Sequence, residues 1–289
     1  GFRVVSERRI ALVAVDSQWR DPKGTFYSFS YAVEKLRASL RSAPDLADAE
    51  ILVLDLRSGD PEEYFERVAA FRPTLVGLST YIWSLEVFAG LTERLRRFDP
   101  RIVLCAGGPA ARRSVLDLAP HRALRDRLDA VITGEGEDVI RSLAREHLEP
   151  GWQKRVAGLE LPGHGLWRSS PPADRPDIEA FPSPYQIDIA PLRKTGYVET
   201  FRGCPIHCAF CQWGEQKSDR VHSTEYLVRH LEGLRRSEAL NVFFLDAAFN
   251  LSPRAFRALV AAEAQVGALK DTVVHGHLYP TYLKEEHLT

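Results

Sequence analysis

The sequence has only four cysteines, no methionine and no long hydrophobic run. A membrane-spanning helix needs about 20 consecutive apolar residues, and no stretch of the chain is that apolar. The first residues lack the apolar core of a secretory signal peptide. The formal net charge of −1 gives no electrostatic reason for binding nucleic acid or a membrane surface. Sparse cysteine favours a reducing compartment, so we expect a cytoplasmic protein without disulfides.

The length of 289 residues suits about two domains. The chain stops at Thr289 in what looks like the start of a helix, and it contains no methionine. We therefore expect it to be part of a longer protein.

Short apolar runs alternate with amphipathic stretches through the first half of the chain. The pattern predicts strands at 10–16, 51–56, 75–80, 102–106 and 130–133, with helices at 27–42, 61–71, 85–98, 113–127 and 137–147. Such alternation is typical of a parallel sheet wrapped by helices. We predict an α/β fold whose first domain, residues 1–149, is Rossmann-like (flavodoxin-like).

Glycines and aromatic residues follow three of these predicted strands. Open α/β sheets bind ligands beyond the carboxyl ends of their strands, and glycines let a bulky ligand approach the backbone. Taken singly, a Gly-Gly pair is more often a turn, and the aromatic residues are more often core or interface residues. The candidate residues are Ser79, Thr80, Tyr81 and Trp83, then Gly107, Gly108 and Pro109, then Gly134, Glu135 and Gly136.

Residues 150–195 are rich in proline and glycine, which predicts a linker. A second series then begins, with predicted strands at 196–201, 241–246 and 271–278 and helices at 224–236 and 253–266. This order suits the first half of a (β/α)6 partial TIM barrel in residues 196–289, with its chemistry at the strand ends. Asp246 and Asn250 follow the second strand there, and His275 and His277 lie at the end of the third.

Three cysteines lie close together after the first of these strands, in the pattern Cys204-x3-Cys208-x2-Cys211. A protein-held [4Fe–4S] cluster usually has four cysteine ligands, so three thiolates would leave one iron open. A structural zinc site also needs four ligands, and Cys105 is about 100 residues away, although His207 could serve. The pattern therefore favours a cluster over zinc or a disulfide.

This motif, with Phe210 before the last cysteine, resembles the radical S-adenosylmethionine (SAM) superfamily. The resemblance implies that the three cysteines hold the cluster and that SAM chelates the open iron. It places Phe210 near the adenine and assigns Trp213 and Asp246 to SAM binding. The Gly-Gly-Glu segment that many members carry after their second strand is missing here, so Asp246 stands in its place.

The Ser-x-Tyr-x-Trp, Gly-Gly-Pro and Gly-Glu-Gly-Glu segments, together with this motif, resemble the cobalamin-dependent radical SAM enzymes. The resemblance implies that the ten loop residues named above bind cobalamin. The Asp-x-His-x-x-Gly loop that supplies a histidine to cobalt is absent after the first strand. We expect the segment around Tyr81 and Trp83 to lie under the lower face of the corrin. The alternative is that Trp83 packs between domains.

The resemblance implies a C-methyltransferase that uses a [4Fe–4S] cluster, SAM and methylcobalamin on a small-molecule, natural-product substrate. A ring contraction, a cyclisation or a non-radical methylation of an sp2 carbon would use the same cofactors. The domain could also be a relic without cobalamin, or the protein a cobalamin-binding sensor. RNA methylthiotransferases need three cysteines in the first domain, which has only Cys105. We expect a monomer that receives electrons from a flavodoxin or ferredoxin; the sequence identifies no catalytic residue.

Overall fold

The computed structural model describes residues 7–18, 27–163, 165–206, 208–211, 213 and 220–287. The chain divides into two compact units. The first comprises Gly1–Gly24 and Ser30–Arg175, and the second comprises Thr25–Phe29 and Pro176–Thr289. The boundary therefore lies inside the predicted linker, and residues 25–29 belong to the second unit.

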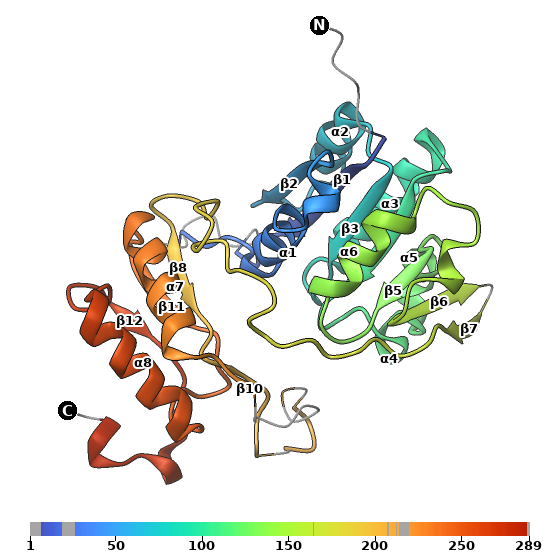
Figure 1. Cartoon of the computed structure of the whole chain (residues 1–289). Helices are drawn as coiled ribbons and strands as arrows, with labels where there is room; N and C mark the ends of the chain where they lie inside the picture. The colour runs from blue at the N-terminus through green and yellow to red at the C-terminus, as the bar shows by residue number, and fades with distance from the viewer. Residues whose placement is uncertain are drawn as a thin grey trace, which may run out of the picture. The chain divides into compact units, whose positions relative to one another are not determined.

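The first unit is built on a seven-stranded sheet with the order β2-β1-β3-β4-β5-β6-β7 (Figure 1). Its first five strands are parallel, in the flavodoxin-like order 2-1-3-4-5. The predicted α/β fold with a parallel sheet is therefore confirmed. These strands are β1 (Arg9–Val15), β2 (Glu50–Leu56), β3 (Leu75–Ser79), β4 (Val103–Gly107) and β5 (Ala130–Ile132).

Helices cover both faces of this sheet. Successive side chains of a strand point to opposite faces, and in β1 Ala11 and Val13 join one core while Ile10 and Leu12 join the other. The first core packs under α2 (Pro61–Phe71), α3 (Leu85–Phe98), α4 (Arg113–Leu116) and α5 (Arg122–Arg125). The second core packs under α1 (Tyr31–Arg41), α6 (Glu137–Glu146) and the short turns η1 (Pro44–Leu46) and η3 (Trp152–Lys154).

Part of the predicted linker forms regular structure instead. Strands β6 (Leu159–Gly163) and β7 (Leu166–Ser169) form an antiparallel hairpin, and β6 pairs with β5. The Trp167 indole donates to the Asp117 carboxylate at 3.0 Å, which fastens the hairpin to the turn after α4. The prediction of a linker was wrong for residues 159–163 and 166–169, because Pro162 and Gly163 are tolerated near a sheet edge.

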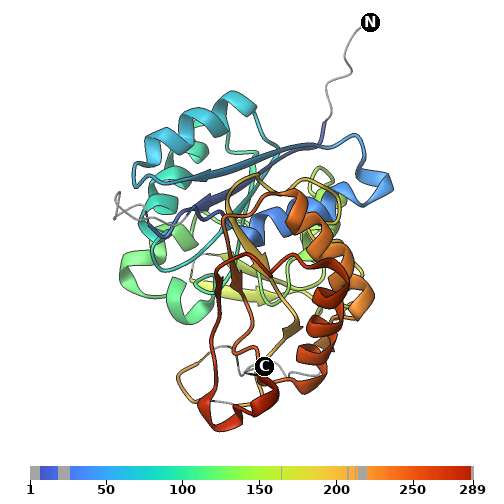
Figure 2. The ribbon, with the colours of Figure 1, turned by 90° about the vertical axis from the view of Figure 1, so that its left-hand side faces the viewer.

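The second unit contains three parallel strands and two helices in alternation. Strands β8 (Thr195–Val198), β11 (Asn241–Phe244) and β12 (Val274–His275) form a sheet with the order β12-β11-β8. Helix α7 (Thr224–Arg236) connects β8 to β11, and α8 (Pro253–Val266) connects β11 to β12. Figures 1 and 2 show the two helices side by side, in orange and red. This is the strand–helix repetition of a partial barrel.

The predicted strand at 196–201 is interrupted. Strand β8 ends at Val198, and residues Phe201–Arg202 form a separate strand, β9, that pairs with β10 (Arg220–Val221). The third strand is also much shorter than predicted, with only Val274–His275 in regular pairing. Helix α1 starts at Tyr31, although the predicted helix began at residue 27.

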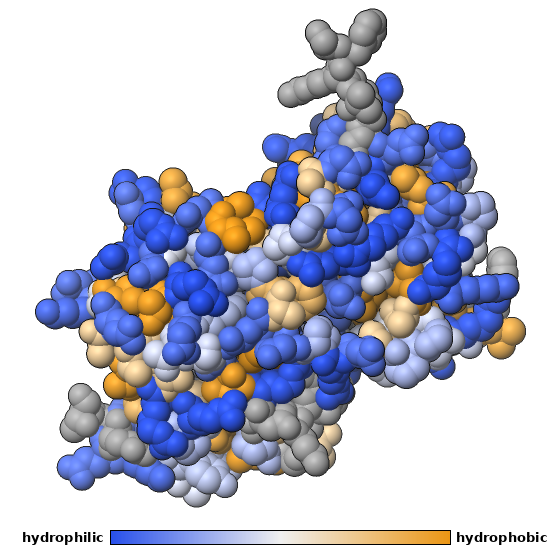
Figure 3. Space-filling view, viewed as in Figure 1, coloured by the Kyte–Doolittle hydropathy of each residue, from blue (hydrophilic) through white to orange (hydrophobic). Residues whose placement is uncertain are grey.

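The surface shown in Figure 3 is mainly hydrophilic, with hydrophobic side chains in separate spots. The first unit buries most of its large apolar residues in its two cores, and the second unit buries others, among them Phe201, Leu231 and Phe244. No helix in the described part of the chain has the length and apolarity that crossing a membrane requires.

Candidate functional site

Three loops of the first unit lie at one edge of its parallel sheet. They follow β3, β4 and β5, whose carboxyl ends point the same way. All ten candidate cobalamin residues lie in or beside these loops, so the topology brings them to one edge. Among them Gly108, Pro109 and Gly134 are exposed, whereas Thr80 is fully buried.

The first two loops are interlocked through Thr80. The Thr80 amide donates to the Gly107 carbonyl at 2.7 Å, and the Ala110 amide donates to the Thr80 carbonyl at 3.1 Å. Gly108 has a φ of +102°, and a Cβ there would lie 2.9 Å from the Thr80 carbonyl oxygen. Only glycine fits this position, both for its backbone conformation and for its close approach to Thr80.

The aromatic residues after β3 form a stacked pair. The rings of Tyr81 and Trp83 lie 4.4 Å apart with an interplanar angle of 14°. The Trp83 indole donates to the Val15 carbonyl at 2.9 Å, at the end of β1, and its ring packs against the first unit's core. Burial raises the pKa of Tyr81. The pair is thus a fixed, half-buried aromatic surface at the sheet edge.

The third loop exposes its backbone. Gly134 has a φ of +87°, and apart from its chain neighbours no atom of the described residues lies within 4 Å of the position that a Cβ would occupy. A Cβ on Gly107 would contact only Ile132, at 3.7 Å. Gly136 is the N-cap of α6. The open space at Gly134 and the single contact at Gly107, among the residues that the structure describes, leave room for a large planar ligand such as cobalamin to approach the backbone.

An acidic cluster at the ends of β1 and β2 was not found from sequence. The Ser30 amide donates to the Asp55 carboxylate at 2.5 Å, and Arg57 pairs with Asp16 at 3.3 Å. Glu34 pairs with Arg37 at 2.7 Å. Burial raises the pKa of Glu34 to about 7, although Arg37 opposes the shift. The only sequence signal was the position of the two aspartates at strand ends.

In the second unit, the cysteine loop follows β9. Cys204 is buried, Cys211 is half-buried and Cys208 is exposed, and none of them forms a disulfide. The Cys211 amide donates to the Cys208 carbonyl at 3.0 Å, which closes a tight turn. Gly203, at a φ of +104°, turns the chain out of β9 into this loop.

The three free thiols are the right donors for a [4Fe–4S] cluster, whose irons bind cysteine thiolates. Among the described residues, no set of three His, Cys, Asp or Glu side chains, these thiols included, is arranged to hold a metal ion. The donor chemistry of the three thiols therefore fits a cluster. Cys105 lies in β4, fully buried in the first unit's core, and burial raises the pKa of its thiol far above its usual range.

The two aromatic residues of the loop that were assigned to SAM point to solvent. Phe210 is 92% exposed and Trp213 is 46% exposed. Single exposed aromatic side chains are common on protein surfaces, so their exposure shows only that both rings are accessible to a ligand. His207 and Gln212 lie outside the described residues.

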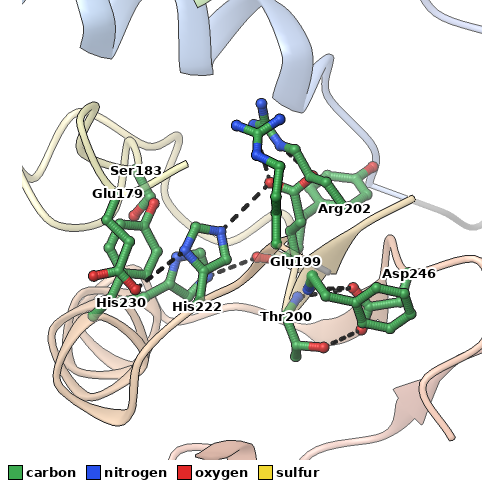
Figure 4. Close-up of polar contacts among 12 residues, drawn as sticks. Glu179, Ser183, Glu199, Thr200, Arg202, His222, His230 and Asp246 are labelled. Carbon is green, nitrogen blue, oxygen red and sulfur yellow. Dashed lines mark hydrogen bonds and ion pairs between the residues drawn. The ribbon is translucent and has the colours of Figure 1, made fainter. Parts of the chain in front are cut away.

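A charged network supports the segment before the loop (Figure 4). Arg202 binds Glu199 with two hydrogen bonds, of 3.0 and 3.1 Å, in the bidentate geometry that strengthens such pairs. The buried His222 ring lies 3.7 Å from the Glu199 carboxylate. Burial alone would raise the pKa of Glu199, but Arg202 and His222 outweigh it and hold this pKa well below its ordinary value.

His222 joins this network to the start of α7. Its other ring nitrogen lies 3.7 Å from Glu179, whose carboxylate accepts hydrogen bonds from the amide and hydroxyl of Ser223. Ser223 caps α7 by accepting from the Tyr226 amide at 3.1 Å. The His222 ring stacks on Tyr226 at 4.0 Å. The sequence predicted the helix that begins at residue 224, but not the histidine between two carboxylates.

Asp246 lies just beyond β11 and is buried. Its carboxylate accepts three hydrogen bonds: from the Thr200 amide at 2.8 Å, the Thr200 hydroxyl at 2.7 Å and the Phe201 amide at 3.3 Å. Burial raises its pKa to about 7, although these donors oppose the shift. Asp246, assigned to SAM from sequence, thus contacts the segment that leads to the cysteines.

Comparisons with known proteins find similarity over much of the chain. The family model described as the B12 binding domain matches residues 35–144. The chain is 30% identical over 222 residues to 2-(S-pantetheinyl)-carbapenam-3-carboxylate methyltransferase of Streptantibioticus cattleyicolor. The aligned region covers 68% of this chain and 31% of that protein. The chain is 28% identical over 229 residues to the cobalamin-dependent radical SAM methyltransferase TokK of Streptomyces tokunonensis, covering 70% of this chain and 32% of that protein.

Among solved structures, the radical SAM methyltransferase TsrM of Kitasatospora setae has the same fold. Its TM-score is 0.69 at 20% identity, over 96% of this chain and 56% of that one. The chain spans about a third of the length of the two curated relatives above. The family resemblance seen in the sequence is confirmed, as are cobalamin, a [4Fe–4S] cluster and SAM as the family's cofactors. The chain belongs to the cobalamin-dependent radical SAM family.

Proposed function

We propose that the protein is a cobalamin-dependent radical SAM methyltransferase that methylates a carbon atom of a small molecule. One observation carries the proposal. The same chain has a glycine-lined sheet edge within a B12 binding domain and a loop of three free thiols after a strand of a β/α series. Neither site alone distinguishes this function, since many proteins bind cobalamin and many hold clusters.

The residues of each unit have separate tasks in this proposal. Gly107, Gly108 and Gly134 let cobalamin approach the backbone, while the stacked Tyr81–Trp83 pair gives the edge a rigid apolar surface. The three thiolates hold the cluster and leave one iron for SAM. When bound, the cluster with SAM supplies a radical and cobalamin supplies a transferable methyl group.

The proposal of a carbon acceptor rests on chemistry. An unactivated carbon has no lone pair to attack the methyl group of SAM, so a chain that binds both cofactors is suited to that acceptor. The two curated relatives are named as methyltransferases, one for a carbapenam carboxylate. We therefore propose a natural-product substrate of comparable size. The proposal includes a flavodoxin or ferredoxin as electron donor and a cytoplasmic monomer.

The test is anaerobic incubation of the reconstituted protein with SAM, cobalamin and a strong reductant. We expect 5′-deoxyadenosine, and S-adenosylhomocysteine as the trace of methyl transfer, by mass spectrometry. Cys208→Ala should abolish 5′-deoxyadenosine. Cys105→Ala is the matched control, because this cysteine is buried in the other unit and should leave the product unchanged. Intact SAM in the presence of a fully loaded cluster would overturn the proposal.

A further inference from the structure

We propose that Asp246 is a positioning residue that clamps the start of the cysteine loop. The inference rests on the proposed function, because it concerns how the chain holds the cluster. It gives this side chain a task different from the SAM contact predicted from sequence. The observation behind it is the placement of one buried carboxylate against Thr200 and Phe201, where β9 begins. Figure 4 shows the contacts between Asp246 and Thr200.

The clamp begins where strand pairing ends. The β8–β11 pairing stops at Val198 and Phe244, with one more hydrogen bond from the Leu245 amide to the Val198 carbonyl at 2.8 Å. Beyond it, in the part of the chain that the structure describes, no strand pairs with the Thr200 and Phe201 amides on that side. Buried backbone donors must be paired, and the Asp246 carboxylate accepts both.

The other edge of this segment is also fixed. Phe201 pairs with Val221 across β9 and β10, and the His222 amide donates to the Thr200 carbonyl at 2.9 Å. The segment is thus held between a short strand on one side and a carboxylate on the other. The carboxylate is 1% exposed, and both of its oxygens already accept hydrogen bonds.

From the clamp the path to the first thiol is short. Only Arg202 and Gly203 separate Phe201 from Cys204. Arg202 is fixed by its two hydrogen bonds to Glu199, and Gly203 makes the turn. Cys204 is the buried member of the three, so its position depends most on the strand before it. Groups that orient a metal ligand in this way tune how tightly the metal is held.

The experiment measures iron retention in the anaerobically reconstituted protein. Asp246→Ala removes the acceptor of all three hydrogen bonds. Asp246→Asn keeps one carbonyl oxygen for the two amides, while the Thr200 hydroxyl can accept from the new amide group. Glu263→Ala is the matched control, because the Glu263 carboxylate also accepts two backbone amides, from Ala268 and Leu269, but at the end of α8. The amino end of β12 follows there, away from the cysteine loop.

We expect Asp246→Ala to lose iron to a chelator about tenfold faster than the wild-type protein. Its reduced cluster should need correspondingly more SAM to change its electron paramagnetic resonance spectrum. Asp246→Asn and Glu263→Ala should both lose iron at a rate within about twofold of wild type. The first variant keeps acceptors for the clamp, and the second changes a side chain that does not contact Thr200 or Phe201. Equal melting temperatures for the Asp246→Ala and Glu263→Ala variants would separate loop positioning from general stability.

Thr200→Val covers the case in which Asp246→Ala does not fold. It removes one of the three donors at nearly constant volume, and we expect iron loss between the wild-type and Asp246→Ala rates. Iron retention and SAM response equal to wild type in Asp246→Ala, or in Thr200→Val if the former is unfolded, would overturn the clamp and leave the proposed function standing. A wild-type protein that takes up no cluster would overturn the proposed function itself.

Discussion

Replacing Gly108 with alanine tests how the loops at the sheet edge of the first unit are held. The new Cβ would lie 2.9 Å from the carbonyl oxygen of Thr80 and 3.2 Å from its amide nitrogen. Both are backbone atoms, and their hydrogen bonds to Gly107 and Ala110 keep them in place. The clash therefore cannot be relieved by turning a side chain.

The magnitude follows from comparison with Gly134, which also has a positive φ but open space around it. Alanine in the left-handed region costs about 1–2 kcal/mol, and this strain applies to both Gly134→Ala and Gly108→Ala. Overpacking against a fixed neighbour adds about 1–3 kcal/mol, and it applies only at Gly108. We expect Gly108→Ala to lower the free energy of unfolding of the first unit by about 2 kcal/mol more than Gly134→Ala does.

Urea unfolding followed by circular dichroism measures the two variants under the same conditions. A change in midpoint at constant slope reports the stability difference. A difference of about 2 kcal/mol corresponds to roughly 4–8 °C in melting temperature for a unit of this size. Equal losses in the two variants would refute the interlock of Thr80 with Gly108, since only the shared backbone strain would then remain.

Three further predictions address the cofactor edge and the buried carboxylates. Gly107→Ala should leave the melting temperature within about 2 °C of wild type, because the new Cβ meets only Ile132, at 3.7 Å. It should nevertheless weaken cobalamin binding in a spectroscopic titration, and an unchanged affinity would argue against this edge as the cobalamin site. The pKa of Glu34 is about 7 in the folded protein and 4.5 in the unfolded chain. The folded state therefore holds this proton more tightly, and the free energy of unfolding should fall as pH rises from about 4.5 to 7. Glu34→Gln should flatten this pH dependence in urea titrations. Folding lowers the pKa of Glu199, so this carboxylate contributes stability at neutral pH that is lost in acid. Glu199→Gln should therefore lower the free energy of unfolding by about 3 kcal/mol at pH 7 and by progressively less below pH 4. A stability difference that does not change with pH would contradict the ion pair.

Local signals in the sequence were enough to place most helices. Pro61 after Asp60 marks the start of α2, and Ser223 and Ser252 mark the starts of α7 and α8, each by accepting an amide hydrogen bond. The predicted bounds of these three helices agree with the structure. The parallel order of the first unit also followed from alternating apolar runs and helices, because adjacent parallel strands need a crossover connection.

Contacts between distant residues could not be read from such signals. The hairpin of β6 and β7 depends on the free edge of β5, and its sequence, with Pro162 and Gly163, resembles a loop. Asp246 and Thr200 are far apart in sequence, and their contact exists because β8 and β11 are neighbours. Within the charged network, Glu199 and Arg202 had a local signal, since residues three apart after a strand end can meet across a bend.

The most direct test of the account is the cobalt and iron content of one anaerobically reconstituted sample. After unbound cofactor is removed by gel filtration, inductively coupled plasma mass spectrometry should find about one cobalt and about four irons per chain. Iron without cobalt would contradict the assignment of the first unit's glycine-lined edge. Cobalt without iron would contradict the assignment of Cys204, Cys208 and Cys211.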